Sequence, residues 1–303
     1  MKRHTFFNTL CYAADILLVI SALLAAYGAV WEYSTRCYLK GFSDAVVPYT
    51  ASGEQKVQAI LTWMEHAPAR RAFTPAENPA SRDPENTLNY DGLLRVCGTA
   101  TNAFVNLADS SGLEARRLLL LSPDRTTNHV VAEVRLDGRW VVVDPVFRAI
   151  LRDASGRPLT RQELADSSIL QEATHNLAGY DPQYNYAITA HVRLAHITYI
   201  GHFLRGALDS LFPGWDESFD WTLLVERESY AVLVVGILLL VLSLFCRFLL
   251  FRYSKRRPDI VRLSLREQLN KAGMALFGRP AAGAFLDTAG PVPRSLDSPS
   301  REV

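Results

Sequence analysis

The chain has few cysteines and almost no net charge. Four cysteines in 303 residues are too few for a disulfide scaffold. A formal net charge of +1 offers no overall basic field for nucleic acid, and neither a Gly-rich phosphate loop nor a basic-aromatic stripe is present. We therefore expect no nucleic-acid partner. A hydrophobic share of 49% also excludes a disordered or collagen-like chain.

Two long apolar runs are present. Residues 16–31 alone are too short a helix to cross about 30 Å of hydrocarbon. Together with the mostly apolar residues 10–15 before them they are long enough, so residues 10–31 are predicted as a first transmembrane helix. A cleaved signal peptide is the alternative there, because residues 26–29 loosely resemble a small-residue cleavage site. Residues 229–251 are predicted as a second transmembrane helix, in which Arg247 snorkels to the interface, with a buried core helix as the alternative.

Charge is segregated along the chain. Residues 32–246 hold 19 basic and 25 acidic residues, a net of −6, and residues 247–303 hold 11 and 5, a net of +6. An excess of Lys and Arg marks the cytoplasmic side. The pattern therefore predicts a two-pass protein of the cytoplasmic (inner) membrane, whose basic tail faces the anionic inner leaflet.

This topology divides the chain into five parts. Residues 1–9 and 252–303 would be cytoplasmic, and residues 32–228 would form the exported domain. In the tail, residues 259–277 are predicted as an amphipathic helix on the membrane, with a solvated helix as the alternative. Disorder is expected after about residue 279, where Pro, Ala, Gly and Ser predominate.

The exported domain has the pattern of an α+β fold. Apolar spacing predicts helices, and Gly112 would end the second of them as a C-cap residue. Asp137-Gly138 is a strong hairpin signal between two β-branched runs. The expected elements are helix 53–66, loop 68–89, helix 93–111, strands 115–121, 129–136 and 139–143, and a mostly helical stretch 174–212.

Three side chains of this domain suggest a catalytic site. Cys97 lies where a loop enters a helix, and a helix N-terminus stabilises a thiolate. His129 begins the first strand of the hairpin and Asp144 ends the second, so antiparallel pairing makes them neighbours. If the helix headed by Cys97 packs on this sheet, the three side chains form the nucleophile, base and orienter of a cysteine hydrolase.

The same residues resemble the transglutaminase-like superfamily, whose fold is related to papain-type cysteine proteases. The resemblance rests on four pieces in order: Cys97, the segment 112–116 (GLEAR), His129 at a strand start, and 140–145 (WVVVDP). It implies that Cys97 is the nucleophile, His129 the general base and then acid, and Asp144 the orienter of the imidazole. It further implies a structural ion pair for Arg116, a core position for Trp140, and no cofactor.

Other roles for these residues remain open. The family often has Gly just before the Cys, whereas Val96 stands here and could restrict access to the thiol. Cys97 could instead be an inert buried thiol or form a disulfide with Cys37. The side-chain donor of an oxyanion hole is not identifiable among the upstream residues Asn89, Tyr90 and Asp91.

A metal site is not expected. His191 and His196 are five residues apart, whereas two ligands on one helical face need a spacing of four. His175 and His202, the other histidines of this region, do not complete a ligand set, and no Glu falls in the run.

The resemblance implies a membrane-anchored bacterial cysteine hydrolase (peptidase or amidase) or acyltransferase. Its partners would be a peptide or amide-containing substrate of the cell envelope and the lipid bilayer, with envelope-assembly proteins as further candidates. The alternative is a catalytically silent binding or scaffold protein in envelope or exopolysaccharide assembly. Protein cross-linking is a third reading. The substrate itself is not readable, because specificity lies in loops such as residues 68–89.

Overall fold

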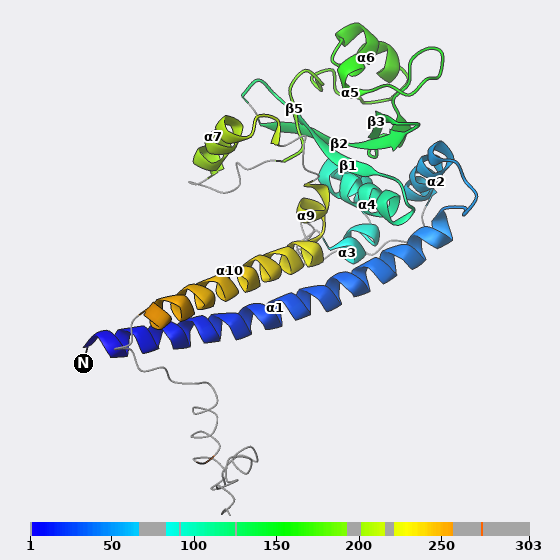
Figure 1. Ribbon diagram of the computed structural model, residues 1–303. Coiled ribbons are helices and arrows are strands. Elements are labelled where there is room, and N and C mark those ends of the chain that lie inside the picture. The colour runs from blue at the N-terminus through cyan, green and yellow to red at the C-terminus, as the bar shows by residue number, and fades with distance from the viewer. Residues whose placement is uncertain are drawn as a thin grey trace, which may run out of the picture. The chain divides into compact units, whose positions relative to one another are not determined.

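The computed structural model describes residues 2–66, 83–90, 92–124, 126–192, 201–215, 221–256 and 274 (Figure 1). The chain forms two compact units, residues 16–243 and residues 1–15 with 244–303. The tail predictions for 259–277 and beyond 279 fall, apart from residue 274, outside the described residues.

A five-stranded antiparallel sheet lies at the centre of the larger unit (Figure 1). Asp137 and Gly138, with φ of 48° and 80°, close the β2–β3 hairpin in the left-handed conformation that matches strand twist. The α+β fold and the predicted hairpin are therefore confirmed. In spatial order the strands are β4 (Ala149–Ile150), β3 (Arg139–Asp144), β2 (Thr127–Leu136), β1 (Ala115–Leu121) and β5 (Thr189–Ala190).

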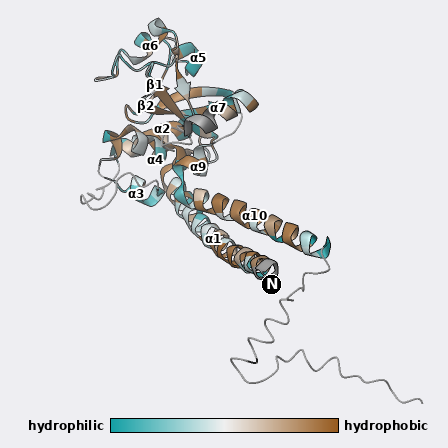
Figure 2. Cartoon of the chain, turned by 90° about the vertical axis from the view of Figure 1, so that its left-hand side faces the viewer, coloured by the Kyte–Doolittle hydropathy of each residue, from teal (hydrophilic) through white to brown (hydrophobic). Residues whose placement is uncertain are grey.

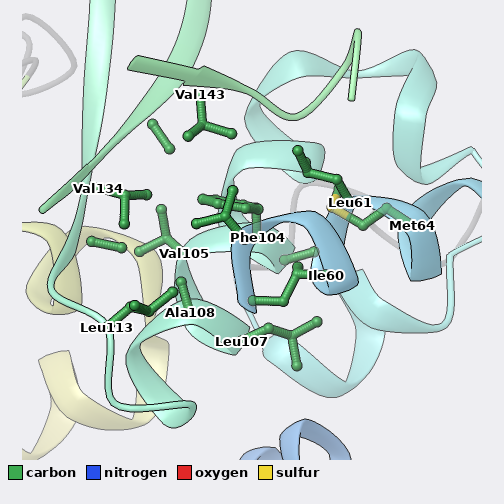
Figure 3. Close-up of a cluster of buried hydrophobic side chains, with 14 of the residues drawn as sticks. Ile60, Leu61, Met64, Phe104, Val105, Leu107, Ala108, Leu113, Val134 and Val143 are labelled. Atoms are coloured by element: carbon green, nitrogen blue, oxygen red, sulfur yellow. The ribbon is translucent and has the colours of Figure 1, made fainter. Parts of the chain in front are cut away.

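Helices α2 (Gly53–His66) and α4 (Cys97–Ser110) cover one face of the sheet. Both follow the predicted helical spacing, and Gly112 follows α4 with φ of 82°, as expected of a C-cap glycine. Figure 3 shows Ile60 and Met64 of α2 against Phe104 of α4, with Val143 of β3 above them. This core fixes α4 against the sheet.

The opposite face of the sheet is covered by α5 (Arg161–Leu164), α6 (Ser167–Thr174) and the segment after them. The prediction of a mostly helical stretch is wrong for residues 175–192, which form turns and β5 before α7 (Gly201–Leu211). Gly179, with φ of 79°, and Pro182 interrupt the helical pattern there.

Part of the predicted loop 68–89 is helical. Helix α3 (Pro84–Leu88) begins after Asp83, whose side chain accepts a hydrogen bond from the Glu85 N–H. An Asp N-cap followed by Pro at the first helical position is a recognisable start signal. A 3-10 turn, η1 (Leu93–Arg95), then leads into α4.

Two helices are long and apolar enough to cross a membrane, α1 (Lys2–Val46) and α10 (Glu228–Arg256). Figure 2 shows the hydrophobic colour over much of α10 and over part of α1. α1 continues 15 residues beyond the predicted end of the span at residue 31, so the same unbroken helix extends into the segment 32–228.

Close helix packing joins α1 to α10 within the larger unit. A Cβ added to Gly28 would lie 2.7 Å from the Leu233 Cα, and one added to Gly236 would lie 2.8 Å from the Ala25 Cα. In the smaller unit, Arg247 pairs with Asp15 at 2.9 Å rather than standing alone as a snorkelling cation. Small residues and a matched charge pair are typical of helix contacts in membranes.

A buried arginine connects the two helices to the domain. Arg227, between α9 (Thr222–Glu226) and α10, is 1% exposed. Its guanidinium donates to Glu32 of α1 at 3.0 Å, and to Asn106 and Asp109 of α4 at 3.0 and 3.2 Å. Ser229 of α10 donates to the second Glu32 oxygen at 2.7 Å. Glu32 of α1, the start of α10 and Asn106 of α4 are therefore joined by one set of buried hydrogen bonds.

Candidate active site

Cys97 is the first residue of α4. Val96 caps the helix with extended backbone and no side-chain hydrogen bond, and its side chain is 46% exposed. Because the helix N-terminus carries partial positive charge, this position favours a thiolate. The thiol is partly buried against the apolar cluster Leu119, Leu121, Val130 and Ala190.

The β2–β3 hairpin brings His129 and Asp144 together. His129 Nε2 lies 2.7 Å from Asp144 Oδ2, and both side chains are buried. The other Asp144 oxygen accepts the backbone N–H groups of Val146 and Phe147 at 3.0 and 3.3 Å. The carboxylate is therefore held by the turn after β3 and orients the imidazole.

The Cys97 thiol and the His129 imidazole affect one another's ionisation. Burial would raise the pKa of this thiol, but interaction with the His129 side chain and its charge, together with the backbone N–H groups of Val130 and Gly98, lower it. Burial likewise opposes a charged imidazole, yet Asp144 and Cys97 raise the pKa of His129 from 6.5 to about 9. Both shifts favour the charged forms, a Cys97 thiolate and a His129 imidazolium.

Aromatic rings that were not among the predicted site residues cover His129. Tyr184 stacks on the imidazole, with ring centroids 4.2 Å apart and planes 3° apart. Phe147 and Tyr180 make T-shaped contacts with it, with ring centroids 6.2 and 6.5 Å from that of the imidazole. Burial raises the pKa of Tyr180, so this phenol stays neutral. The signal in the sequence was the run of three tyrosines in 180–186 (YDPQYNY).

A cavity of about 790 Å³ lies beside this aromatic cover. Tyr180 and Tyr184 line it, so its wall is shared with the His129 environment. The rest of its lining combines apolar side chains such as Leu170 with amide, hydroxyl, imidazole and carboxylate groups, among them Gln171, His175 and Asp181. The volume is within the range of small-molecule sites.

A second cluster of buried charged side chains is centred on Glu133 of β2, four residues along the strand from His129. Glu133, 1% exposed, accepts from Arg116 at 2.8 Å and contacts His191 Nε2 at 3.0 Å. The ion pair implied for Arg116 is therefore present, and His191 has a carboxylate partner. Trp140 is half-buried under the Arg116 guanidinium, 4.1 Å from the ring centroid, rather than in the core.

All four cysteines of the chain are described and carry free thiols, so the Cys37–Cys97 disulfide is not formed. Of the upstream candidates for an oxyanion donor, Asn89 uses its amide nitrogen on Tyr38 Oη and the Glu85 carbonyl, at 3.2 and 2.8 Å. The Tyr90 ring packs over Gly92, and Asp91 lies outside the described residues.

Residues 41–145 match the family model of the transglutaminase-like superfamily. This segment is a transglutaminase-like domain. It contains α2, α4 and strands β1–β3, and with them Cys97, His129 and Asp144. Comparisons with curated proteins and with solved structures gave no match. The tyrosines that cover His129 follow the matched segment, so the transglutaminase-like domain is completed by chain outside it.

Proposed function

We propose that this protein is a membrane-anchored cysteine hydrolase or acyltransferase that acts on an amide through Cys97, His129 and Asp144. The observation that carries the proposal is the buried His129–Asp144 pair, 2.7 Å apart, whose imidazole interacts with a thiol at the α4 N-terminus. The free state of Cys97 and the pKa shifts of Cys97 and His129 support it.

The chemistry follows from these charges. The Cys97 thiolate attacks the amide carbonyl carbon, forming a C–S bond, and the electron pair of the C=O bond moves to oxygen. The His129 imidazolium gives its proton to the amide nitrogen, the C–N bond breaks, and a thioester remains. Neutral His129 then takes a proton from water or an acceptor amine, which attacks the thioester and releases the thiolate.

The anionic intermediate needs hydrogen-bond donors. The Cys97 N–H belongs to the first residue of α4 and has no acceptor within the helix, so it is available to the oxyanion. The aromatic cover of Tyr184 and Phe147 keeps water from the His129–Asp144 bond.

A thiol-reactive probe tests the catalytic pair in the full chain, solubilised in detergent, with labelling located by mass spectrometry. Cys97 should be labelled at neutral pH, and His129→Ala should slow that labelling at least tenfold. His66→Ala, which removes an exposed histidine of α2, is the matched control and should leave the rate unchanged. An unreactive Cys97 with His129 intact would favour the silent scaffold.

The same proposal places residues 32–228 outside the cytoplasmic membrane, both termini inside, and a peptide or other amide of the envelope as substrate. The basic flank of α10 supports this orientation. In intact cells carrying Cys97→Ser, a membrane-impermeant maleimide should label Cys37, which is exposed on α1. Labelling of Cys37 only after lysis would reverse the orientation.

Hydrolysis and amine transfer are separated by one further measurement. The full chain is incubated with a glutamine-containing peptide and a labelled primary amine. Incorporation of the amine indicates cross-linking activity, whereas deamidation alone indicates hydrolysis.

A further inference from the structure

A threonine one helical turn after Cys97 contacts the strand that carries His129. Thr101 is fully buried, and its hydroxyl donates to the Val130 carbonyl at 3.0 Å. Residues four apart lie on the same face of a helix, so Cys97 and Thr101 face β2 together. A threonine within a helix often bonds the carbonyl of its own preceding turn, but here the hydroxyl reaches another element.

Val130 directly follows His129 and contacts α4 at two points. Its carbonyl accepts from Thr101, and Cys97 packs against the apolar cluster to which Val130 belongs. Two contacts four residues apart on a helix therefore fix one residue of the strand in translation and in rotation. Since His129 is the neighbouring residue, the same contacts set where its imidazole meets the thiol.

Regular pairing of β2 ends close to this point, just beyond His129 on the β1 side and at Ala132 on the β3 side. The β1–β2 register shifts between Leu120, which opposes His129, and Leu121, which opposes Thr127. The β2–β3 register runs from Leu136 only to Ala132. Sheet pairing therefore specifies the His129 position less well than that of residues 132–136.

We propose that Thr101 is a positioning residue for the Cys97–His129 pair, whose hydroxyl fixes the strand register that brings the imidazole to the thiol. The inference rests on the proposed function. A buried hydroxyl that only satisfies a carbonyl would contribute to stability without altering Cys97 chemistry, and the two roles are separable by measurement.

The test uses the full chain in detergent, with the rate of Cys97 alkylation by iodoacetamide measured from pH 5 to 10 and the melting temperature of each sample recorded. Thr101→Val removes the hydroxyl at similar volume, and Thr101→Ser keeps it. Thr99→Val is the matched control, because Thr99 is also buried on α4 near Cys97. Should Thr101→Val not be recovered folded, Thr101→Ala gives the same comparison.

Thr101→Val should slow alkylation at pH 7 about tenfold and move the pH profile about one unit upward, since one pKa unit is a factor of ten in thiolate at a given pH. Thr101→Ser should return the rate to within about threefold of the wild type, and Thr99→Val should leave it unchanged. A Thr101→Val variant with a lower melting temperature but the wild-type pH profile overturns the inference. A wild-type rate that does not depend on His129 overturns the proposed function instead.

Discussion

The charge state of the Cys97–His129 pair depends on a few neighbours with opposing effects. Burial disfavours both charged forms, and in each case a neighbouring group offsets this effect. His129 stabilises the thiolate, and Asp144 stabilises the imidazolium. Because the two partners offset burial together, removing one should change the titration of the other.

The pH dependence of Cys97 reactivity follows from these shifts. The thiolate forms as pH rises through the lowered pKa of Cys97, and the imidazolium persists until pH rises through about 9. Alkylation of wild-type Cys97 should therefore reach half its maximum below pH 9. In His129→Ala this midpoint should rise, because the cation that lowered the pKa is gone, and in Asp144→Asn it should lie between. Identical midpoints in all three proteins would contradict the ion pair.

Tyr184 is expected to hold the imidazole through its stacked ring. Tyr184→Leu should reduce the Cys97 labelling rate about threefold to tenfold, because an aromatic pair contributes about 0.5–1.5 kcal/mol beyond its buried area. Tyr184→Phe keeps the ring and should retain the wild-type rate. If Phe lowers the rate as much as Leu, the hydroxyl rather than the ring is responsible.

At the scale of elements, the packing of α1 on α10 leaves no room at Gly28. Replacing Gly by Ala in a helix ordinarily adds about 1 kcal/mol of stability. Gly41, also in α1, has no atom within 4 Å of an added Cβ, so Gly41→Ala should raise the melting temperature slightly. Gly28→Ala should lower it, because the new methyl group meets the Leu233 backbone. Equal effects of the two substitutions would show that the helices are not packed closely there.

The sequence predicts local elements here better than their assembly. The strand pattern and Asp137-Gly138 place His129 beside Asp144, because a hairpin pairs residues that are close in sequence. The Tyr184 stack depends on a segment 55 residues beyond His129 whose turns have no periodic pattern. No local rule predicts such a contact, and the same is true of the Asp15–Arg247 pair.

At the scale of the whole molecule, buried charge links the apolar helices to the domain. Glu32 has two arginine partners, Arg227 at 1% exposure and Arg36 at 58%. Arg227→Met should destabilise the protein by about 3–5 kcal/mol, because Glu32 and Asp109 lose a buried partner. Arg36→Met should cost at most about 1 kcal/mol, as for exposed pairs. Thermal unfolding in detergent measures both, and equal losses would contradict this division.

The Glu226 side chain extends the same linkage along the same face of α4. It accepts from Asn102 at 3.0 Å and forms an ion pair with Arg117 of β1. Thr222 of α9 also accepts from the Arg117 backbone at 3.2 Å. A truncated protein that ends at residue 221 would therefore lack the partners of Asn102 in α4 and Arg117 in β1.

This linkage has a consequence for the order of events during biosynthesis. Arg227 and Glu226 are made about 120 residues after Asn102 and Asn106, and about 195 after Glu32. Until they leave the ribosome, Glu32 lacks its partner Arg227, and Asn102 and Asn106 of α4 lack their hydrogen-bond partners in this segment. The nascent domain can therefore form its sheet early, but the helix that carries the thiol reaches its final setting only when the second apolar helix has begun to emerge.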